Sequence, residues 1–261
     1  MKKSPYISRR HALIGAAAIP LAAATANTAR AAAPLMDAGT APFQRVKLGG
    51  FDVTTLLAGT RSVPDPQKIF GMNVDKETFD NVSAAAHLPI DAAQFFFTPT
   101  VVNTGAELVL FDTGLSGAGT TAALAAAGYT PDQVDIVVIT HMHGDHIGGL
   151  STDGTRTFPN ARYVTGSKEF DAWSGTDNTN FDGKMQPLAE ETTMLVDGKS
   201  VGPEITAMAA YGHTPGQLVS SPESNDTPLL LGPAFPKPSV CELTPPDRDV
   251  TLDMGNSTTR H

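Results

Sequence analysis

The stretch Thr140-His141-Met142-His143-Gly144-Asp145-His146-Ile147-Gly148-Gly149 holds four candidate metal ligands within six residues, in a chain of 261 residues with only seven histidines. It follows residues 136–139, a continuous apolar run typical of a strand buried on both faces. In an extended backbone, side chains two residues apart point the same way, which brings His141 and His143 together. Gly144 lets the chain turn, so we expect Asp145 and His146 on the other side of one cavity.

These ligand types favour a metal over a merely solvated polar loop. Imidazole nitrogens and a carboxylate oxygen suit zinc, with manganese, iron or cobalt as alternatives. A further histidine lies 67 residues beyond His146, in Gly212-His213-Thr214-Pro215-Gly216, directly after a predicted strand over residues 204–210. Alone, a histidine in such a turn is more often structural. Beside the first motif, His213 is a candidate ligand.

The rest of the chain predicts strands separated by turns, with helices inserted between them. Gly49-Gly50 and Thr104-Gly105 are each expected to join a hairpin. Residues 61–88 lack periodicity and predict irregular structure with one short helix. We expect strands over residues 45–48, 51–58, 94–103, 107–111, 136–139, 161–165, 204–210, 217–221 and 228–231, and helices over 120–127, 167–173 and 181–188. This pattern predicts an α/β protein with two packed sheets and helices outside.

The two histidine motifs, H141-x-H-x-D-H146 and G212-H-T-P-G216, resemble those of the metallo-β-lactamase superfamily. Residues 95–149 are similar to the methyl parathion hydrolase and N-acyl homoserine lactonase branch, in Val101-Val102-Asn103-Thr104-Gly105, Leu110-Phe111-Asp112-Thr113-Gly114 and Ala127-Gly128-Tyr129. The resemblance runs from about residue 43 to about residue 231.

This resemblance implies a four-layer αββα sandwich with a metal pair at one edge between the sheets. His141, His143 and His213 would hold the first metal, and Asp145 and His146 would hold part of the second. Asp112 matches the family's acidic residue under the site, which is expected to position the ligands through hydrogen bonds.

Two departures from the family pattern bear on the second metal. The family has a bridging Asp just after a strand-end glycine, where this chain reads Leu229-Leu230-Leu231-Gly232-Pro233, and proline cannot coordinate. The family also supplies a last histidine from a segment beyond this point. We therefore expect the sandwich to lack its final C-terminal segment, with one tight metal site and a weakened second. His261 is a poor substitute ligand, because it is the terminal residue.

The resemblance implies a hydrolase in which a metal-bound hydroxide attacks neutral esters, lactones or organophosphate triesters, with Asp145 orienting the hydroxide. One alternative is a degenerate metal-binding paralogue with little or no turnover. Another is a thioester or glutathione hydrolase of the same fold. Hydrolysis of β-lactams is less favoured, because residues 95–149 are similar to the lactonase and triesterase branch.

A small, neutral, apolar substrate needs an apolar pocket, and four aromatic residues are candidates for its wall. Phe95, Phe96 and Phe97 lie on a predicted strand, where an aromatic residue is more often part of the core. Trp173 lies on the helix after the histidine motif. The sequence does not decide whether the side chain of Trp173 faces the cleft or the core.

The N-terminus has the layout of an export signal. Ser8-Arg9-Arg10-His11 is a twin-arginine stretch, an apolar run of about 15 residues follows, and Ala29-Arg30-Ala31 offers a cleavage site. The run is too short to span a membrane. We expect residues 1–31 to be a twin-arginine signal peptide and residues 32–261 a metallo-β-lactamase-like hydrolase domain, which is periplasmic or secreted and keeps no membrane anchor after cleavage.

The net charge and the cysteine content limit which binding partners and which cysteine-based sites this chain can have. The chain has 18 basic and 27 acidic residues, a net charge of −9. The first 31 residues hold five of the basic residues and no acidic one, so the remainder has 13 against 27 and a charge of −14. This excess of negative charge disfavours nucleic acid as a partner. The single cysteine, Cys241, excludes an internal disulfide and a cysteine-based zinc cluster. Homodimer formation is left open.

Overall fold

A computed structural model describes residues 41–202, 204–224, 227–229 and 231–232 of the chain. The predicted signal peptide, Pro233, Cys241 and His261 lie outside these residues. In the described part of the chain, no helix is both long and apolar enough to cross a lipid bilayer.

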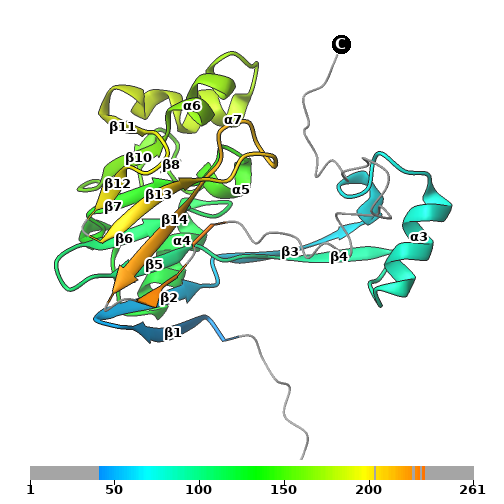
Figure 1. Ribbon diagram of the computed structural model, residues 1–261, viewed down its shortest axis with the longest axis horizontal. Coiled ribbons are helices and arrows are strands. Elements are labelled where there is room, and N and C mark those ends of the chain that lie inside the picture. The colour runs from blue at the N-terminus through cyan, green and yellow to red at the C-terminus, as the bar shows by residue number, and fades with distance from the viewer. Residues whose placement is uncertain (1–40, 203, 225–226, 230, 233–261) are drawn as a thin grey trace, which may run out of the picture. The chain divides into compact units, whose positions relative to one another are not determined.

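A seven-stranded mixed sheet forms the centre of the fold (Figure 1). Two of its central strands, Leu108–Phe111 and Ile136–Ile139, bury every residue because both faces are covered, as the apolar run at 136–139 predicted. The order is β1 (Phe43–Leu48), β2 (Phe51–Leu56), β5 (Thr100–Asn103), β6 (Leu108–Phe111), β7 (Ile136–Ile139), β10 (Arg162–Gly166) and β11 (Thr192–Leu195). The pairings of β6 with β7, β7 with β10 and β10 with β11 are parallel, and the others are antiparallel.

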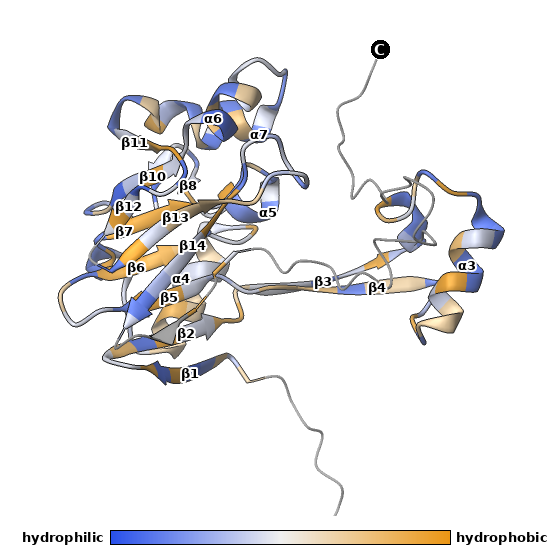
Figure 2. Cartoon of the chain, viewed as in Figure 1, coloured by the Kyte–Doolittle hydropathy of each residue, from blue (hydrophilic) through white to orange (hydrophobic). Residues whose placement is uncertain are grey.

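A four-stranded antiparallel sheet packs on one face of the larger sheet. Its order is β12 (Ser200–Gly202), β13 (Ile205–Ala209), β14 (Leu218–Ser224) and β15 (Thr227–Pro228). Buried Val109, Val138 and Val164 of the large sheet meet Ile205 and Leu218 of the small one. Figure 2 shows β6, β7 and β13 as largely hydrophobic.

Helices cover the opposite face of the large sheet. There Leu110 and Val137 pack with Leu124, Phe181 and Leu188 in a second core cluster. The covering elements are α4 (Gly117–Ala126), α5 (Gly144–Ile147), α6 (Ser167–Ser174), α7 (Thr179–Lys184) and the 3₁₀ helix η3 (Gln186–Glu191). The predicted α/β sandwich is confirmed. The described residues form three layers, which are the helices, the large sheet and the small sheet. The short elements η2 (Pro131–Gln133), β8 (Ser151–Thr152) and β9 (Thr155–Arg156) lie in connections.

The structure of residues 59–97 differs from the one predicted from the sequence. The expected single strand over 94–103 is two strands, β4 (Ala92–Phe97) and β5, because Pro99 interrupts the ladder. Residues 59–64, expected to be irregular from residue 61, form β3 (Gly59–Pro64), which pairs with β4 in a separate two-stranded sheet. The connection from β3 to β4 contains η1 (Pro66–Lys68) and the one helix predicted here, α3 (Lys76–Ala85).

Smaller differences concern element ends and several short strands that were not predicted. α4 begins at Gly117 rather than residue 120, because the hydroxyl of Ser116 accepts a hydrogen bond from Gly119 N at 3.2 Å and caps the helix. The helix expected over 181–188 is α7 followed by η3, with Pro187 at the start of the 3₁₀ turn. Strands β11 and β12 are short, and their polar composition gave no clear strand signal.

Candidate metal centre

The candidate site lies where strands of both sheets end. Asp112 directly follows β6, residues 140–146 follow β7, and His213 lies between β13 and β14. The carboxyl ends of parallel strands lie at one edge of a sheet, so β6 and β7 deliver their following residues to the same place. Gly149 allows the histidine loop to press closely on the chain after β6, since a Cβ there would overlap the carbonyl oxygen of Thr113.

Three histidine nitrogens converge on one point. His141 Nε2 lies 3.0 Å from His143 Nδ1, His143 Nδ1 lies 3.1 Å from His213 Nε2, and His213 Nε2 lies 3.1 Å from His141 Nε2. His141 is buried, and the other two are half-buried. The structure thus brings together the three residues that sequence analysis assigned to a first metal.

This donor set fits a metal ion. Ligands about 2.0–2.1 Å from a tetrahedral zinc lie roughly 3.3–3.4 Å apart, close to the spacing found here. Three imidazole nitrogens in so small a triangle cannot all make linear hydrogen bonds with one another, whereas one cation accepts a lone pair from each. The histidine triad therefore has the geometry and the chemistry of a three-histidine metal site.

The electrostatics keep the imidazoles of His141 and His143 neutral, the form in which histidine binds metals. Burial is the main cause that lowers the pKa of His141, and the neighbouring His146 adds to it. Burial and then the proximity of His213 lower the pKa of His143 to about 4, against a partial opposing effect of Asp145. Near neutral pH, no proton competes strongly for these two nitrogens.

Asp145 and His146 form a second pair of donors next to the triad. His146 Nε2 lies 3.4 Å from Asp145 Oδ2, and the rings of His141 and His146 have centroids 3.8 Å apart. Burial opposes the charged form of His146, but the charges and hydrogen bonds of Asp112 and Asp145 outweigh it and raise the pKa to about 10. Two donors alone leave most positions of a second metal to other groups or water.

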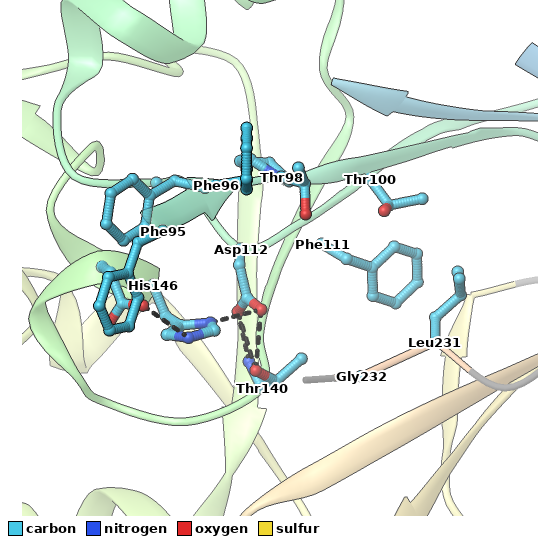
Figure 3. Close-up of a pocket in the computed structure, with 14 residues that line it drawn as sticks. Phe95, Phe96, Thr98, Thr100, Phe111, Asp112, Thr140, His146, Leu231 and Gly232 are labelled. Atoms are coloured by element: carbon cyan, nitrogen blue, oxygen red, sulfur yellow. Dashed lines mark hydrogen bonds and ion pairs between the residues drawn. The ribbon is translucent and has the colours of Figure 1, made fainter. Parts of the chain in front are cut away.

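Asp112 lies beneath the histidines and contacts His146 and Thr140. Its Oδ2 lies 2.8 Å from His146 Nδ1, which leaves Nε2 of that ring directed toward Asp145. It also accepts hydrogen bonds from Thr140 N at 2.9 Å and from the Thr140 hydroxyl. That hydroxyl lies 3.1 Å from His141 Nδ1. Figure 3 shows Asp112 between His146 and Thr140. The backbone of Asp112 has φ of 59°, a conformation that Asp and Asn tolerate better than most residues.

A cavity of about 430 Å³ opens beside Asp145 and His146. Its wall carries the three candidate phenylalanines, Phe95, Phe96 and Phe97, from the end of β4. None of the three belongs to the buried core, although Phe95 and Phe97 stack with ring centroids 6.4 Å apart. Further apolar lining comes from Pro99 and from Phe111 and Leu231, of which the last two are labelled in Figure 3. The cavity therefore has an apolar wall and a polar end at the candidate metal ligands.

Trp173 does not line this cavity but contacts the histidine triad. Its ring lies edge-on to His143, with centroids 5.5 Å apart and an interplanar angle of 89°. The indole Nε1 donates to Glu169 Oε1 at 2.7 Å. Neither Glu169 nor Thr140 is among the site residues predicted from the sequence. A charged residue four positions before Trp173, in a helix whose apolar side faces the core, was the only available signal for Glu169.

Comparisons with known proteins agree with this geometry. A family model described as the metallo-beta-lactamase superfamily matches residues 98–231. The uncharacterized protein YobT of Bacillus subtilis is 27% identical over 138 residues, which cover 49% of this chain and 58% of YobT. The exodeoxyribonuclease WalJ of Streptococcus pneumoniae is 31% identical over 101 residues, 39% of this chain and 36% of WalJ. The chain thus spans little more than half of YobT and about a third of WalJ.

Three solved structures share the fold. AidC, a dizinc quorum-quenching lactonase, superposes with a TM-score of 0.63 at 20% identity, over 72% of each chain. The hydrolase AbOPH gives 0.64 at 22% identity, over 74% of this chain and 73% of that one. A probable metal-dependent hydrolase from Staphylococcus aureus gives 0.60 at 22% identity, over 71% and 73%. Identities this low support a shared fold and do not by themselves identify a substrate.

Proposed function

Because this chain belongs to the metallo-β-lactamase superfamily, whose members are metal-dependent hydrolases with lactonases among them, we propose that it hydrolyses small, neutral esters, lactones or organophosphate triesters. The observation that carries the proposal is the convergence of His141, His143 and His213 within 3.1 Å of one another, next to a cavity with an apolar wall. We propose zinc as the metal, with manganese, iron or cobalt as substitutes.

A metal held by this triad would supply Lewis acidity, which favours ionisation of water and polarises a carbonyl or phosphoryl oxygen. The protein's own groups then divide the remaining work. Asp145 lines the cavity, and its pKa is lowered because the hydrogen bond and the positive charge of His146 outweigh burial. As a carboxylate it can accept a hydrogen bond from a water molecule and orient it toward a substrate. Asp112 keeps His146 in place while this happens.

The cavity walls support a neutral and partly apolar substrate. Phe95, Phe97 and Leu231 offer apolar contact for an acyl or aryl group. Among the described lining residues, the charged ones are Asp112 and Asp145, apart from His146, and none is a lysine or arginine. A phosphodiester backbone would meet these carboxylates with no lysine or arginine to pair with its phosphates, so we propose that nucleic acid is not the substrate, although WalJ is named an exodeoxyribonuclease.

The test combines metal content with a substrate panel. Protein loaded with each candidate metal is offered a neutral lactone, an aryl ester, a phosphotriester, a glutathione thioester, a β-lactam and single-stranded DNA. We expect turnover of one or more of the first three. His141→Ala and His143→Ala should each remove most bound metal and the activity, since each deletes one of three ligands. Exposed Glu190→Gln is the matched control. Full metal content in both histidine variants would contradict the metal assignment.

A second candidate, a metal-binding paralogue with little turnover, is favoured by one feature of the sequence, Pro233 at the place of the family's bridging carboxylate. Bound metal found by elemental analysis, together with no turnover of any substrate in the panel, would support this second candidate. Turnover of the glutathione thioester alone would instead indicate a thioester hydrolase.

We also propose that the twin-arginine segment directs export to the periplasm or the medium. The supporting observation is the layout of Arg9-Arg10, the short apolar run and the small residues up to Ala31. Lysine at both positions 9 and 10 should leave precursor in the cytoplasm. An uncleaved N-terminus on protein recovered outside the cytoplasm would contradict the assignment.

A further inference from the structure

Glu169 is a fully buried carboxylate that contacts both loops of the histidine triad. It lies in the first turn of α6, and its exposed fraction is 0%. Its Oε1 accepts from Met142 N at 3.0 Å, in the middle of His141-Met142-His143. Its Oε2 accepts from the Thr214 hydroxyl at 2.7 Å and from Gly216 N at 2.9 Å, in the loop that carries His213.

These contacts, with the indole of Trp173 on Oε1, give the carboxylate four donors. An ionised carboxylate has about four acceptor positions and no donor, so this environment matches it completely. Hydrogen bonds to an ionised acceptor are stronger than neutral ones, which offsets the cost of burying the charge. The first turn of a helix also favours a negative group.

The two loops are far apart in the sequence and meet at this side chain. Met142 is 27 residues before Glu169, and Gly216 is 47 residues after it. The second loop lies directly on the first turn of α6, because a Cβ at Gly216 would overlap the backbone of Lys168 and Glu169. Trp173, bound to the same carboxylate, packs edge-on against His143.

We infer that Glu169 is a positioning residue that holds the loop of His141 and His143 and the loop of His213 at the spacing a metal ion requires. The inference rests on the metal site of the proposed function but not on its substrate. Each loop is tied to a different oxygen of one rigid carboxylate, so the distance between the loops is set by the side chain between them. A residue that merely filled space would not need this pairing.

The chemistry of glutamine makes the variant Glu169→Gln informative. The carboxamide has nearly the same shape but replaces one acceptor oxygen with an NH₂ donor. Met142 N and Trp173 Nε1 are both fixed donors, so the carboxamide oxygen must stay with them. The NH₂ group then faces Gly216 N–H, donor against donor, while the Thr214 hydroxyl can turn and accept. The variant should therefore loosen the His213 loop and spare the His141–His143 loop.

The experiment measures metal affinity by competition with a chromogenic zinc chelator, on the full chain after removal of metal. We expect Glu169→Gln to weaken zinc binding about 10- to 100-fold, the range typical for loss of a residue that orients ligands. The exposed Glu190→Gln on η3 is the matched control and should bind zinc as the unmodified chain does. Thr214→Val, which deletes one donor at nearly constant volume, should give a smaller loss in the same direction and serves if Glu169→Gln does not fold.

A double-mutant cycle with His213→Ala separates positioning from general destabilisation. If Glu169 acts through His213, then Glu169→Gln causes little further loss of affinity once His213 is absent. A merely structural role would weaken zinc binding by the same factor in both backgrounds, which would overturn the inference. So would unchanged affinity in folded Glu169→Gln and in Thr214→Val. An unmodified chain that binds no zinc would refute the metal site itself, whereas normal zinc binding without hydrolysis would refute only the proposed activity.

Discussion

Asp112 Oδ2 lies 2.8 Å from His146 Nδ1, and the same carboxylate accepts hydrogen bonds from the backbone and hydroxyl of Thr140. One side chain thus orients a ligand of the candidate second metal and, through Thr140, the ring of His141 in the first. Such a carboxylate fixes which ring nitrogen carries the proton, so that the other nitrogen is free for a metal.

We predict that Asp112→Asn lowers metal occupancy at both positions and reduces activity about 10- to 100-fold. The amide of asparagine has only one acceptor oxygen and no charge. It can accept a hydrogen bond from Thr140 or from His146 Nδ1, but it cannot serve both as the carboxylate does. Asparagine also tolerates the left-handed backbone found at this position, so folding should be preserved. Elemental analysis and thermal unfolding of the variant check the two parts. Full metal content with normal turnover would contradict the role given to Asp112.

The edge-on contact of Trp173 with His143 offers a direct optical readout. Trp173 is the only tryptophan in the chain, so all tryptophan fluorescence reports this place. We predict that Co²⁺ quenches this fluorescence in a saturable way with one ion per chain, because a paramagnetic ion at the triad would bind the His143 ring, whose centroid lies 5.5 Å from that of the indole.

Two variants control this titration. His143→Ala should shift the quenching to much higher Co²⁺ concentration, and Trp173→Phe should abolish the signal while retaining metal. Quenching that is unaffected by His143→Ala would place the ion elsewhere.

The metal-free protein should be most stable near pH 6.5. The pKa of His143 is lowered to about 4 in the folded state, so its contribution is present above pH 6.5 and is lost as the pH falls toward 4. The pKa of His146 is raised to about 10, so its contribution is present below pH 6.5 and is lost as the pH rises toward 10. Urea midpoints measured in chelator at pH 5, 6.5 and 9 check this.

Matched variants separate the two limbs of the pH profile. His146→Asn should flatten the alkaline decline, and His143→Asn should reduce the acidic one. An alkaline decline that is the same with and without His146 would show that another group causes it.

We further predict that the chain holds close to one tightly bound metal, and that Pro233→Asp raises both second-metal occupancy and turnover. Gly232, the residue before Pro233, lines the cavity beside Asp145 and His146. A bridging carboxylate holds two metals about 3.5–4 Å apart, at which both act on one oxygen. Elemental analysis of both forms is the measurement. The prediction fails if the unmodified chain already binds two metals tightly, or if folded Pro233→Asp changes neither occupancy nor rate.

Local motifs in the sequence were sufficient to predict the central strand and most of the candidate ligands, for physical reasons. His141, His143, Asp145 and His146 lie within six residues, so any turn at Gly144 keeps them close whatever the rest of the fold does. Residues 136–139 are apolar without alternation, and only a strand covered on both faces accommodates that pattern. His213 was a candidate ligand because it follows a predicted strand in a chain that has the first motif, and the family resemblance then assigned it to the first metal. Its 67-residue separation from His146 carries no geometric information.

Tertiary structure decided the features that depend on partners distant in sequence. The strand expected over 94–103 divides at Pro99 because residues 59–64 pair with 92–97, and no local pattern in 59–64 announces that partner. Glu169 looks like an ordinary helical acid in the sequence. It becomes the meeting point of the two loops that carry the histidine triad only because α6 follows β10 and lies between them, where a buried carboxylate needs donors and those of both loops are within reach.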